Sequence, residues 1–96
     1  MIDNINVEQL KLIVSKINII DIRSVEKYNS SHIQNSINIP FNKLLVEPSI
    51  YLRLNETYYI YCSKGIKSLS MCIYLSKLGY KVININGGYE KWLLKK

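Results

Sequence analysis

Apolar residues follow two different spacings, one typical of helices and one typical of buried strands, which alternate along the chain. Residues 7–14 place apolar side chains at helical spacing behind Asn6, a typical N-cap, so a helix is predicted there. Residues 17–23 are instead nearly continuously apolar, with a break at Asp21. Such a run is typical of a strand that is covered on both faces, as in a parallel sheet.

The same alternation continues to the C-terminus. Further strands are predicted over residues 36–40, 57–62 and 81–85, and helices after Ser24, in residues 41–54 with a break near Pro48, over 68–78, and after Gly87-Gly88. Strands that alternate with helices predict an α/β sandwich on a mainly parallel sheet. The length of 96 residues fits one domain, residues 1–96.

The stretch YIYCSKGIKS, residues 59–68, joins a predicted strand to a predicted helix. Together with the strand of residues 81–85 it forms a βαβ unit, whose crossover should be right-handed. Cys62 therefore follows the carboxyl end of a parallel strand. In open α/β sheets this is where ligands bind.

Several features of this loop favour the thiolate form of Cys62. The helix predicted to begin near Ser68 directs free N–H groups and the positive end of its dipole at the loop. Gly65 allows the backbone to curl its amides around an anion, and Lys64 and Lys67 add positive charge. Because the thiolate is the reactive form, we predict that Cys62 is an activated nucleophile. The alternative is a small apolar residue that ends a strand.

Net charge, the N-terminal sequence and the number of cysteines limit which ligands, metals and cellular locations are expected. The net charge is +6, but the lysines are spread along the sequence, which favours attraction of anionic small molecules or acidic partners over nucleic-acid binding. No long apolar stretch marks the N-terminus, so neither a signal peptide nor a membrane span is predicted, and a cytoplasmic monomer is expected. Two cysteines and one histidine cannot form an ordinary four-ligand zinc site, and we expect no metal and no cofactor.

Three segments carry a family resemblance. Residues 62–68, Cys-Ser-Lys-Gly-Ile-Lys-Ser, resemble the active-site loop of rhodanese-like sulfurtransferases, Cys-x-x-Gly-x-Arg-Ser. Residues 20–40, IDIRSVEKYNSSHIQNSINIP, resemble that family's N-terminal signature without gaps, and residues 79–92, GYKVININGGYEKW, are similar to its closing Gly-Tyr, Gly-Gly and Trp pattern. The three matches occur in order and cover nearly the whole chain.

The resemblance implies a rhodanese-like three-layer sandwich with a five-stranded, mainly parallel sheet flanked by helices. It also implies that Cys62 is catalytic: it takes a sulfane sulfur from thiosulfate or a persulfide donor, holds it as a persulfide, and passes it to cyanide or a thiol. The expected partners are a small anionic sulfur donor and a thiol acceptor that can belong to a protein. Substrate binding is predicted for Ser63, Lys64, Gly65, Ile66, Lys67, Ser68 and Arg23.

Three positions depart from the family pattern. Lys67 stands where the family has arginine, so the charge is kept but the planar fork that holds an oxyanion through two parallel hydrogen bonds is lost. We therefore expect thiosulfate to be held less well. Ser31 and Asn35 stand where the family has glycine. Because asparagine tolerates a positive φ better than serine, the turn should survive, slightly altered.

The signature also contains three polar residues outside the loop. Asp21 is predicted either to support the loop through a hydrogen bond or to act as a local strand-end acceptor. Arg23 is predicted either to point into the substrate mouth or to pair with a surface acid. His32, the only histidine, is interpreted as a hydrogen-bonded structural residue rather than a general base.

Cys72 lies on the apolar stripe of the helix predicted over residues 68–78, together with Met71, Leu75 and Leu78. The simpler interpretation is inert packing. The alternative is a second thiol that forms a disulfide with Cys62 under oxidation.

Other functions compete with sulfur transfer. Dual-specificity phosphatases need a cysteine, five residues and an arginine, and Ser68 occupies that last position here, which disfavours a phosphatase or an arsenate reductase. A non-catalytic binding or regulatory module remains an alternative, because fold does not settle function, although such a module could dispense with Cys62. A persulfide carrier whose acceptor is a protein thiol lies between these possibilities.

Overall fold

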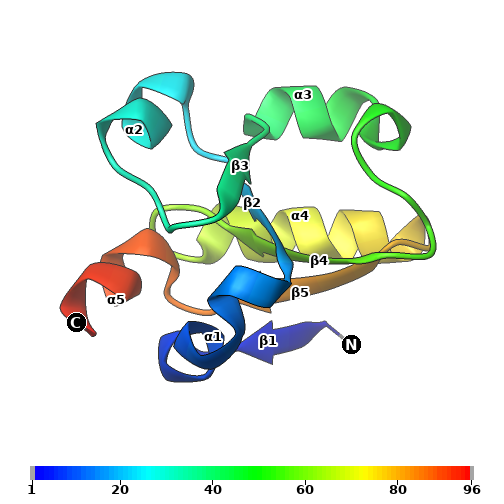
Figure 1. The fold of residues 1–96 in the computed structure, drawn as a ribbon. Coiled ribbons are helices and arrows are strands. Elements are labelled where there is room, and N and C mark those ends of the chain that lie inside the picture. Colours follow the sequence, from blue (N-terminus) through cyan, green and yellow to red (C-terminus); the bar gives the residue numbers. More distant parts are fainter. Residues whose placement is uncertain (1, 96) are drawn as a thin grey trace.

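The chain folds into a five-stranded sheet with helices on both faces (Figure 1). The computed structural model describes residues 2–95. The strands are β1 (Asp3–Ile5), β2 (Asn18–Asp21), β3 (Ser36–Asn38), β4 (Thr57–Tyr61) and β5 (Lys81–Ile85); the helices are α1 (Val7–Ile13), α2 (Val25–Ser30), α3 (Phe41–Val46), α4 (Ile66–Lys77) and α5 (Gly88–Leu94), with 3-10 turns η1 (Val14–Lys16) and η2 (Pro48–Ile50). All neighbouring strands are parallel, in the order β1-β5-β4-β2-β3. This confirms the predicted α/β sandwich.

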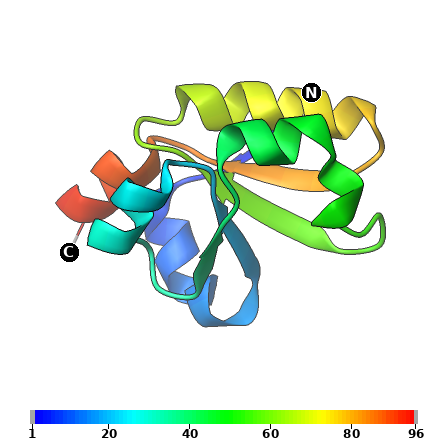
Figure 2. The ribbon, with the colours of Figure 1, turned by 90° about the horizontal axis from the view of Figure 1, so that it is seen from above.

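The apolar core is divided into two clusters by the sheet. Helices α3 and α4 cover one face, and α1 and α5 cover the other (Figure 2). Because successive side chains of a strand point to opposite faces, β2 sends Ile20 to the first cluster and Ile19 to the second, and β4 likewise sends Ile60 and Tyr61 to opposite sides. Both strands are therefore covered on both faces, as their continuous apolar runs predicted.

Helix α4 begins earlier than the sequence pattern indicated. It spans Ile66–Lys77, with Gly65 as N-cap in the left-handed region, so Ser68 lies inside the first turn rather than at its start. Met71, Cys72 and Leu75 are buried as predicted. The prediction that Leu78 is buried was wrong: it follows the last helical residue and is 48% exposed.

Strand β1 was not predicted from the pattern. It has only three residues, two of them exposed, and pairs with β5 at the edge of the sheet. So short a segment has no readable period. Within residues 2–95, none of the helices is both long and apolar enough to cross a bilayer.

The turn before β3 contains the two residues that replace family glycines. Asn35 has a φ of 70°, and its amide nitrogen donates hydrogen bonds to the carbonyl oxygens of Val14 and Ile17, each at 3.0 Å. Ser31 has a φ of −171°, an extended conformation that any residue can adopt. The turn survives as expected, because the left-handed position holds the residue type that tolerates it and adds side-chain bonds of its own.

We expect stability at position 35 to fall in the order Asn, Gly, Ala. Asn35→Gly keeps the backbone conformation but loses both hydrogen bonds, whereas Asn35→Ala loses them and adds left-handed strain, for a total cost of about 2 kcal/mol. Urea unfolding measures the free energy of unfolding of both variants. Ser31→Ala is the control and should stay within about 0.5 kcal/mol of the original chain. An Asn35→Gly variant as stable as the original would show that the two bonds contribute nothing.

Candidate active site around Cys62

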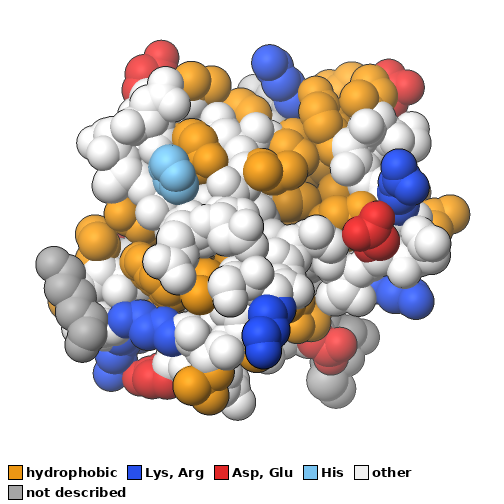
Figure 3. Space-filling view, in the orientation of Figure 1, with side chains coloured by type: hydrophobic (Ala, Val, Ile, Leu, Met, Phe, Trp, Pro, Cys, Tyr) orange, Lys and Arg blue, Asp and Glu red, His pale blue; other side chains and the backbone are white. Residues whose placement is uncertain are grey.

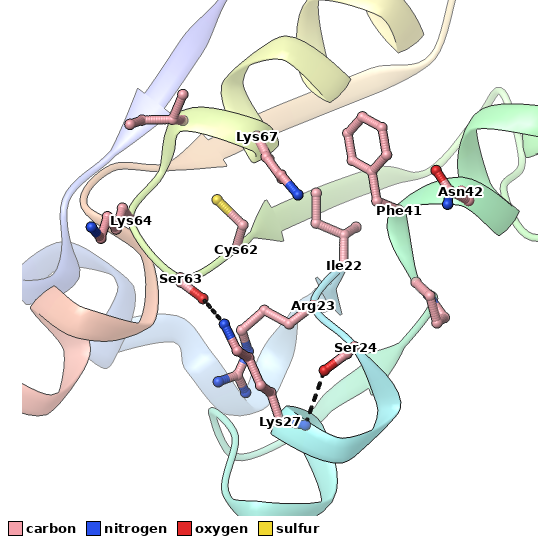
Figure 4. Close-up of a pocket in the computed structure, with 12 residues that line it drawn as sticks. Ile22, Arg23, Ser24, Lys27, Phe41, Asn42, Cys62, Ser63, Lys64 and Lys67 are labelled. Carbon is pink, nitrogen blue, oxygen red and sulfur yellow. Dashed lines mark hydrogen bonds between the residues drawn. The ribbon is translucent and has the colours of Figure 1, made fainter.

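Cys62 lies directly after β4, at the carboxyl edge of the sheet, and faces a pocket of about 620 Å³ (Figure 4). The pocket lies between the Cys62 loop, the start of α2 and the start of α3. Only 6% of the residue surface of Cys62 is exposed. The predicted position at the end of a parallel strand is therefore confirmed, and Cys62 lines this pocket.

Backbone amides surround the sulfur of Cys62. Its Sγ accepts hydrogen bonds from the amide of Gly65 at 3.1 Å and from the amide of Ser68 at 3.3 Å. Both amides belong to the unpaired first turn of α4, where the helix dipole also favours negative charge. The Ser68 hydroxyl oxygen lies 3.3 Å from the same sulfur. The curl of amides predicted from the sequence is present, and the earlier start of α4 brings Ser68 into it.

The loop keeps this shape because it is packed against the start of α5 and the glycine before it. The carbonyl oxygen of Cys62 accepts a hydrogen bond from the amide of Tyr89 at 2.9 Å, and that of Ser63 accepts one from the amide of Glu90 at 3.0 Å. A Cβ on Gly88 would collide with the carbonyl oxygen of Cys62, and a Cβ on Gly65 would lie 2.9 Å from the amide nitrogen of Gly87. With the loop carbonyls held on this side, the loop amides face Sγ.

Burial raises the pKa of the Cys62 thiol, but hydrogen bonding opposes it. Hydrogen bonds to the sulfur outweigh burial and leave this pKa below its ordinary value: one from the Ser68 hydroxyl, when its proton turns to Sγ, and those from the amides of Ser68, Gly65 and Lys64. Cys72 behaves in the opposite way, because it is fully buried among apolar groups and burial raises its pKa to about 12. The two cysteines thus differ in reactivity, and the geometry of Cys72 is that of a packing residue.

Three lysines border the pocket. Lys67 extends from the first turn of α4 toward the space beside Sγ, while the side chain of Lys64 is directed away from it (Figure 4). Lys27 of α2 reaches the loop from the other side, with its Nζ 3.5 Å from the Ser63 hydroxyl. The sequence analysis missed Lys27, because only the folded chain brings α2 next to the loop.

Much of the rest of the pocket wall is apolar, although Ser24 and Asn42 also line it. Ile22, Pro40, Phe41 and Ile66 line it, and Ile66 is 73% exposed. Of the four, only Ile66 was predicted as a site residue. The others come from segments far from the loop in sequence, and the two periods along the chain do not indicate that they share a cavity.

Arg23 borders the pocket, and its guanidinium is paired within the protein, so substrate binding by this side chain stays a prediction. Its Nη2 lies 2.7 Å from Oδ2 of Asp21 and also donates to the Ser31 carbonyl oxygen at 2.7 Å. The guanidinium carbon lies 4.3 Å from the ring centre of Tyr89. Arg23 is 9% exposed and borders the pocket, but its charge is neutralised by a buried acid rather than by a surface one.

Asp21 does not hydrogen-bond to residues 62–68, so the loop-bonding role predicted for it was wrong. Its carboxylate accepts from Arg23 and, at 2.6 Å, from the hydroxyl of Tyr61, the last residue of β4. It is fully buried. Asp21 is therefore a strand-end acceptor that holds Tyr61, the residue before Cys62, and influences the loop only through that strand.

His32 lies outside the pocket, on the surface visible in Figure 3. Its Nδ1 pairs with the Tyr28 carbonyl oxygen at 2.7 Å, and its ring stacks on that of Tyr28 with 3.8 Å between centres. This fits the structural role predicted for it. Among residues 2–95, no three His, Cys, Asp or Glu side chains are grouped so that they could hold a metal ion. The lysines and arginines on the face shown in Figure 3 are scattered.

Comparison with known proteins identifies relatives of this fold. The chain is 34% identical over 75 residues to a thiosulfate sulfurtransferase GlpE of Coxiella burnetii, covering 77% of this chain and 69% of the relative. It is 33% identical over 75 residues to a probable molybdopterin-synthase adenylyltransferase of Porphyra purpurea, with the same coverage of this chain. A crystal structure of a rhodanese-related protein from Thermoplasma volcanium superposes with a TM-score of 0.89 at 28% identity, over 97% of this chain and 92% of that one.

Some of these relatives are much longer than the part they share with this chain. The match spans 20% of the Porphyra protein and 41% of a putative sulfur carrier protein of Bacillus subtilis. The family model for the rhodanese-like domain, in contrast, matches residues 6–95. Nearly the whole chain is therefore accounted for by one family, and this protein belongs to the rhodanese-like domain family.

Proposed function

We propose that this protein is a sulfurtransferase that moves a sulfane sulfur from thiosulfate or a persulfide donor to a thiol or cyanide through a persulfide on Cys62. The observation that carries the proposal is the environment of Sγ, which accepts hydrogen bonds from two amides of a helix start at the base of a pocket bordered by lysines. Sulfurtransferase names among the relatives support it.

The proposed reaction has two displacement steps. In the first, the Cys62 thiolate attacks the sulfane sulfur of thiosulfate; a bond forms between Sγ and that sulfur, the sulfur–sulfur bond of thiosulfate breaks, and sulfite leaves with the electron pair. In the second, cyanide or an acceptor thiolate attacks the outer sulfur and leaves as thiocyanate or as an acceptor persulfide, which returns the Cys62 thiolate. No external oxidant or reductant is needed.

The chain's own groups serve this cycle by holding negative charge. The thiolate and the persulfide are both anions, so the same amides of Gly65 and Ser68 stabilise each of them. Lys67 and Lys27 lie where they can attract an anionic donor to the mouth of the pocket. Both cations are lysines, which bind an oxyanion as point charges without a planar fork.

A protein thiol is a second candidate acceptor. The pocket is wide for thiosulfate alone, and one of its walls, formed by Ile22, Pro40, Phe41 and Ile66, is apolar. Such a wall suits the organic part of a larger thiol. A non-catalytic binding module is less consistent with the site, because binding a partner does not require a thiol with a lowered pKa.

Incubation with thiosulfate, or with a persulfide donor such as glutathione persulfide, should add one sulfur atom to the intact protein mass. Cyanide should then remove it. Cys62→Ser should show no gain, and Cys72→Ser, which removes the buried thiol, should load as the original chain does. No gain with either donor would contradict sulfur transfer and favour the binding module.

Lys67→Arg should increase thiosulfate activity. A guanidinium offers two parallel hydrogen bonds to the donor's sulfonate-like end, and a gain of about 1 kcal/mol corresponds to a roughly fivefold lower KM. Steady-state kinetics with thiosulfate and cyanide measures this. The matched control is Lys77→Arg, the same change at the far end of α4, outside this pocket. Unchanged kcat and KM in Lys67→Arg would contradict a role of this side chain in donor binding.

A further inference from the structure

A row of polar side chains, buried at Ser68 and Asn84 and exposed at Asn4, runs from the reactive sulfur to the edge of the sheet, and the proposed reaction does not use it. The Ser68 hydroxyl donates to Oδ1 of Asn84 at 2.6 Å. Nδ2 of Asn84 donates to Oδ1 of Asn4 at 2.9 Å, and Nδ2 of Asn4 donates to the Ile2 carbonyl oxygen at 3.3 Å. Ser68 is fully buried and Asn84 is 1% exposed. An asparagine buried within a strand is costly unless its polar atoms are bonded.

The direction of each bond in this row is set by the next one. The Ile2 carbonyl can only accept, so it fixes which end of the Asn4 amide faces it, and Asn4 then presents an oxygen to Asn84. Asn84 must give this oxygen its Nδ2 group and therefore presents its own oxygen to Ser68. A serine hydroxyl has one proton, and here that proton is directed at Asn84.

Cys62 stands at the other end of the row. Because the Ser68 proton is used on Asn84, the Ser68 oxygen accepts from the Cys62 S–H, at a distance of 3.3 Å. This arrangement satisfies every group while Cys62 is a thiol. When Cys62 ionises, either its thiolate faces a serine lone pair, or the hydroxyl turns to Sγ and leaves the buried oxygen of Asn84 without a donor.

We propose that Asn84 is a positioning residue, which directs the Ser68 hydroxyl away from Sγ and so stabilises the thiol form of Cys62 against the thiolate. This refines the proposed function and rests on it only in assigning the reactive thiolate to Cys62. The Ser68 hydroxyl can lower the pKa of Cys62 only when its proton faces Sγ, and Asn84 competes for that proton. The amides of Gly65 and Ser68 carry no such competition, because both donate to Sγ in the structure.

Asn84 is uncharged, so its replacement by an apolar residue leaves the charges around Cys62 in place. Charged and titratable groups that line the pocket or lie close to Cys62 and its hydrogen-bonded neighbours include Lys27 from α2, Lys64 from the loop, Lys67 and Cys72 from α4, Asp21 and Arg23 from the end of β2, Tyr61 from β4, and Tyr89 and Glu90 from α5. A change in the ionisation of Cys62 in an Asn84 variant can therefore be attributed to the hydroxyl.

The test is the pH dependence of Cys62 alkylation by iodoacetamide in the full chain, followed by peptide mass. In Asn84→Leu the midpoint should move to lower pH, and the rate at a pH well below the original midpoint should rise roughly fivefold. The same substitution in a Ser68→Ala background should leave the midpoint unchanged, because the effect depends on the Ser68 hydroxyl. An unchanged or raised midpoint in folded Asn84→Leu, or a full shift in the Ser68→Ala background, would overturn the proposal.

Asn4 offers a second pair of variants close to the surface, which decides the matter if Asn84→Leu fails to fold. Asn4→Ala removes the acceptor that orients Asn84, so the Asn84 amide can turn its Nδ2 to Ser68, and the midpoint should again fall. Asn4→Gln stays uncharged and keeps an amide oxygen as acceptor, so it should not lower the midpoint. Equal midpoints in the two variants would refute the proposal. Sulfur loading is measured separately by intact mass, so failure of the proposed function and failure of this role are distinguishable.

Discussion

The active-site loop depends on hydrogen bonds in which the first amides of α5 take the carbonyl oxygens of Cys62 and Ser63. A peptide carbonyl and its following amide point in opposite directions, so fixing the Ser63 carbonyl on one side of the loop turns the amide of Lys64 to the other side, where it helps to lower the pKa of Cys62. This requires very close approach of two backbone segments, and Gly88 allows it because a side chain there would collide with the loop. The start of α5 therefore helps to hold the conformation of the loop whose amides surround Sγ.

A second constraint is the buried carboxylate of Asp21, which binds the last residue of β4, directly before Cys62. The buried carboxylate of Asp21 is satisfied by Arg23 and by the hydroxyl of Tyr61, which also accepts from the amide of Ile33 at 3.1 Å. Loss of one partner of such a buried pair would leave an uncompensated charge and would strongly destabilise the fold. Arg23 borders the pocket, but its guanidinium is paired with Asp21. Since Asp21 also binds Tyr61, this pair stabilises the ends of β2 and β4.

The sequence was most informative where the signal is local. The two apolar periods predicted the order of strands and helices, apart from the short edge strand β1, and the combination of strand end, glycine and helix start located Cys62. Features that depend on distant segments were not readable. Lys27 and Phe41 line the pocket from two separate helices. Arg23 is buried with Asp21 because the chain after α2 returns to it and places the Ser31 carbonyl within hydrogen-bond distance. Asn84 was not singled out from the sequence, because its partner Ser68 is on another element.

The groups that bind Sγ at the base of this pocket are mostly main-chain atoms, whereas the side chains of Ser63, Lys64, Ile66 and Lys67 project around its rim. Replacing a rim side chain leaves the amides where they are, since glycines and carbonyl bonds hold them. Reactivity and selectivity are thereby encoded in different parts of the same short segment. If Cys62 acts as proposed, a chain built in this way can exchange one sulfur donor for another over evolutionary time by single rim substitutions, with little loss of stability and without any change at the cysteine.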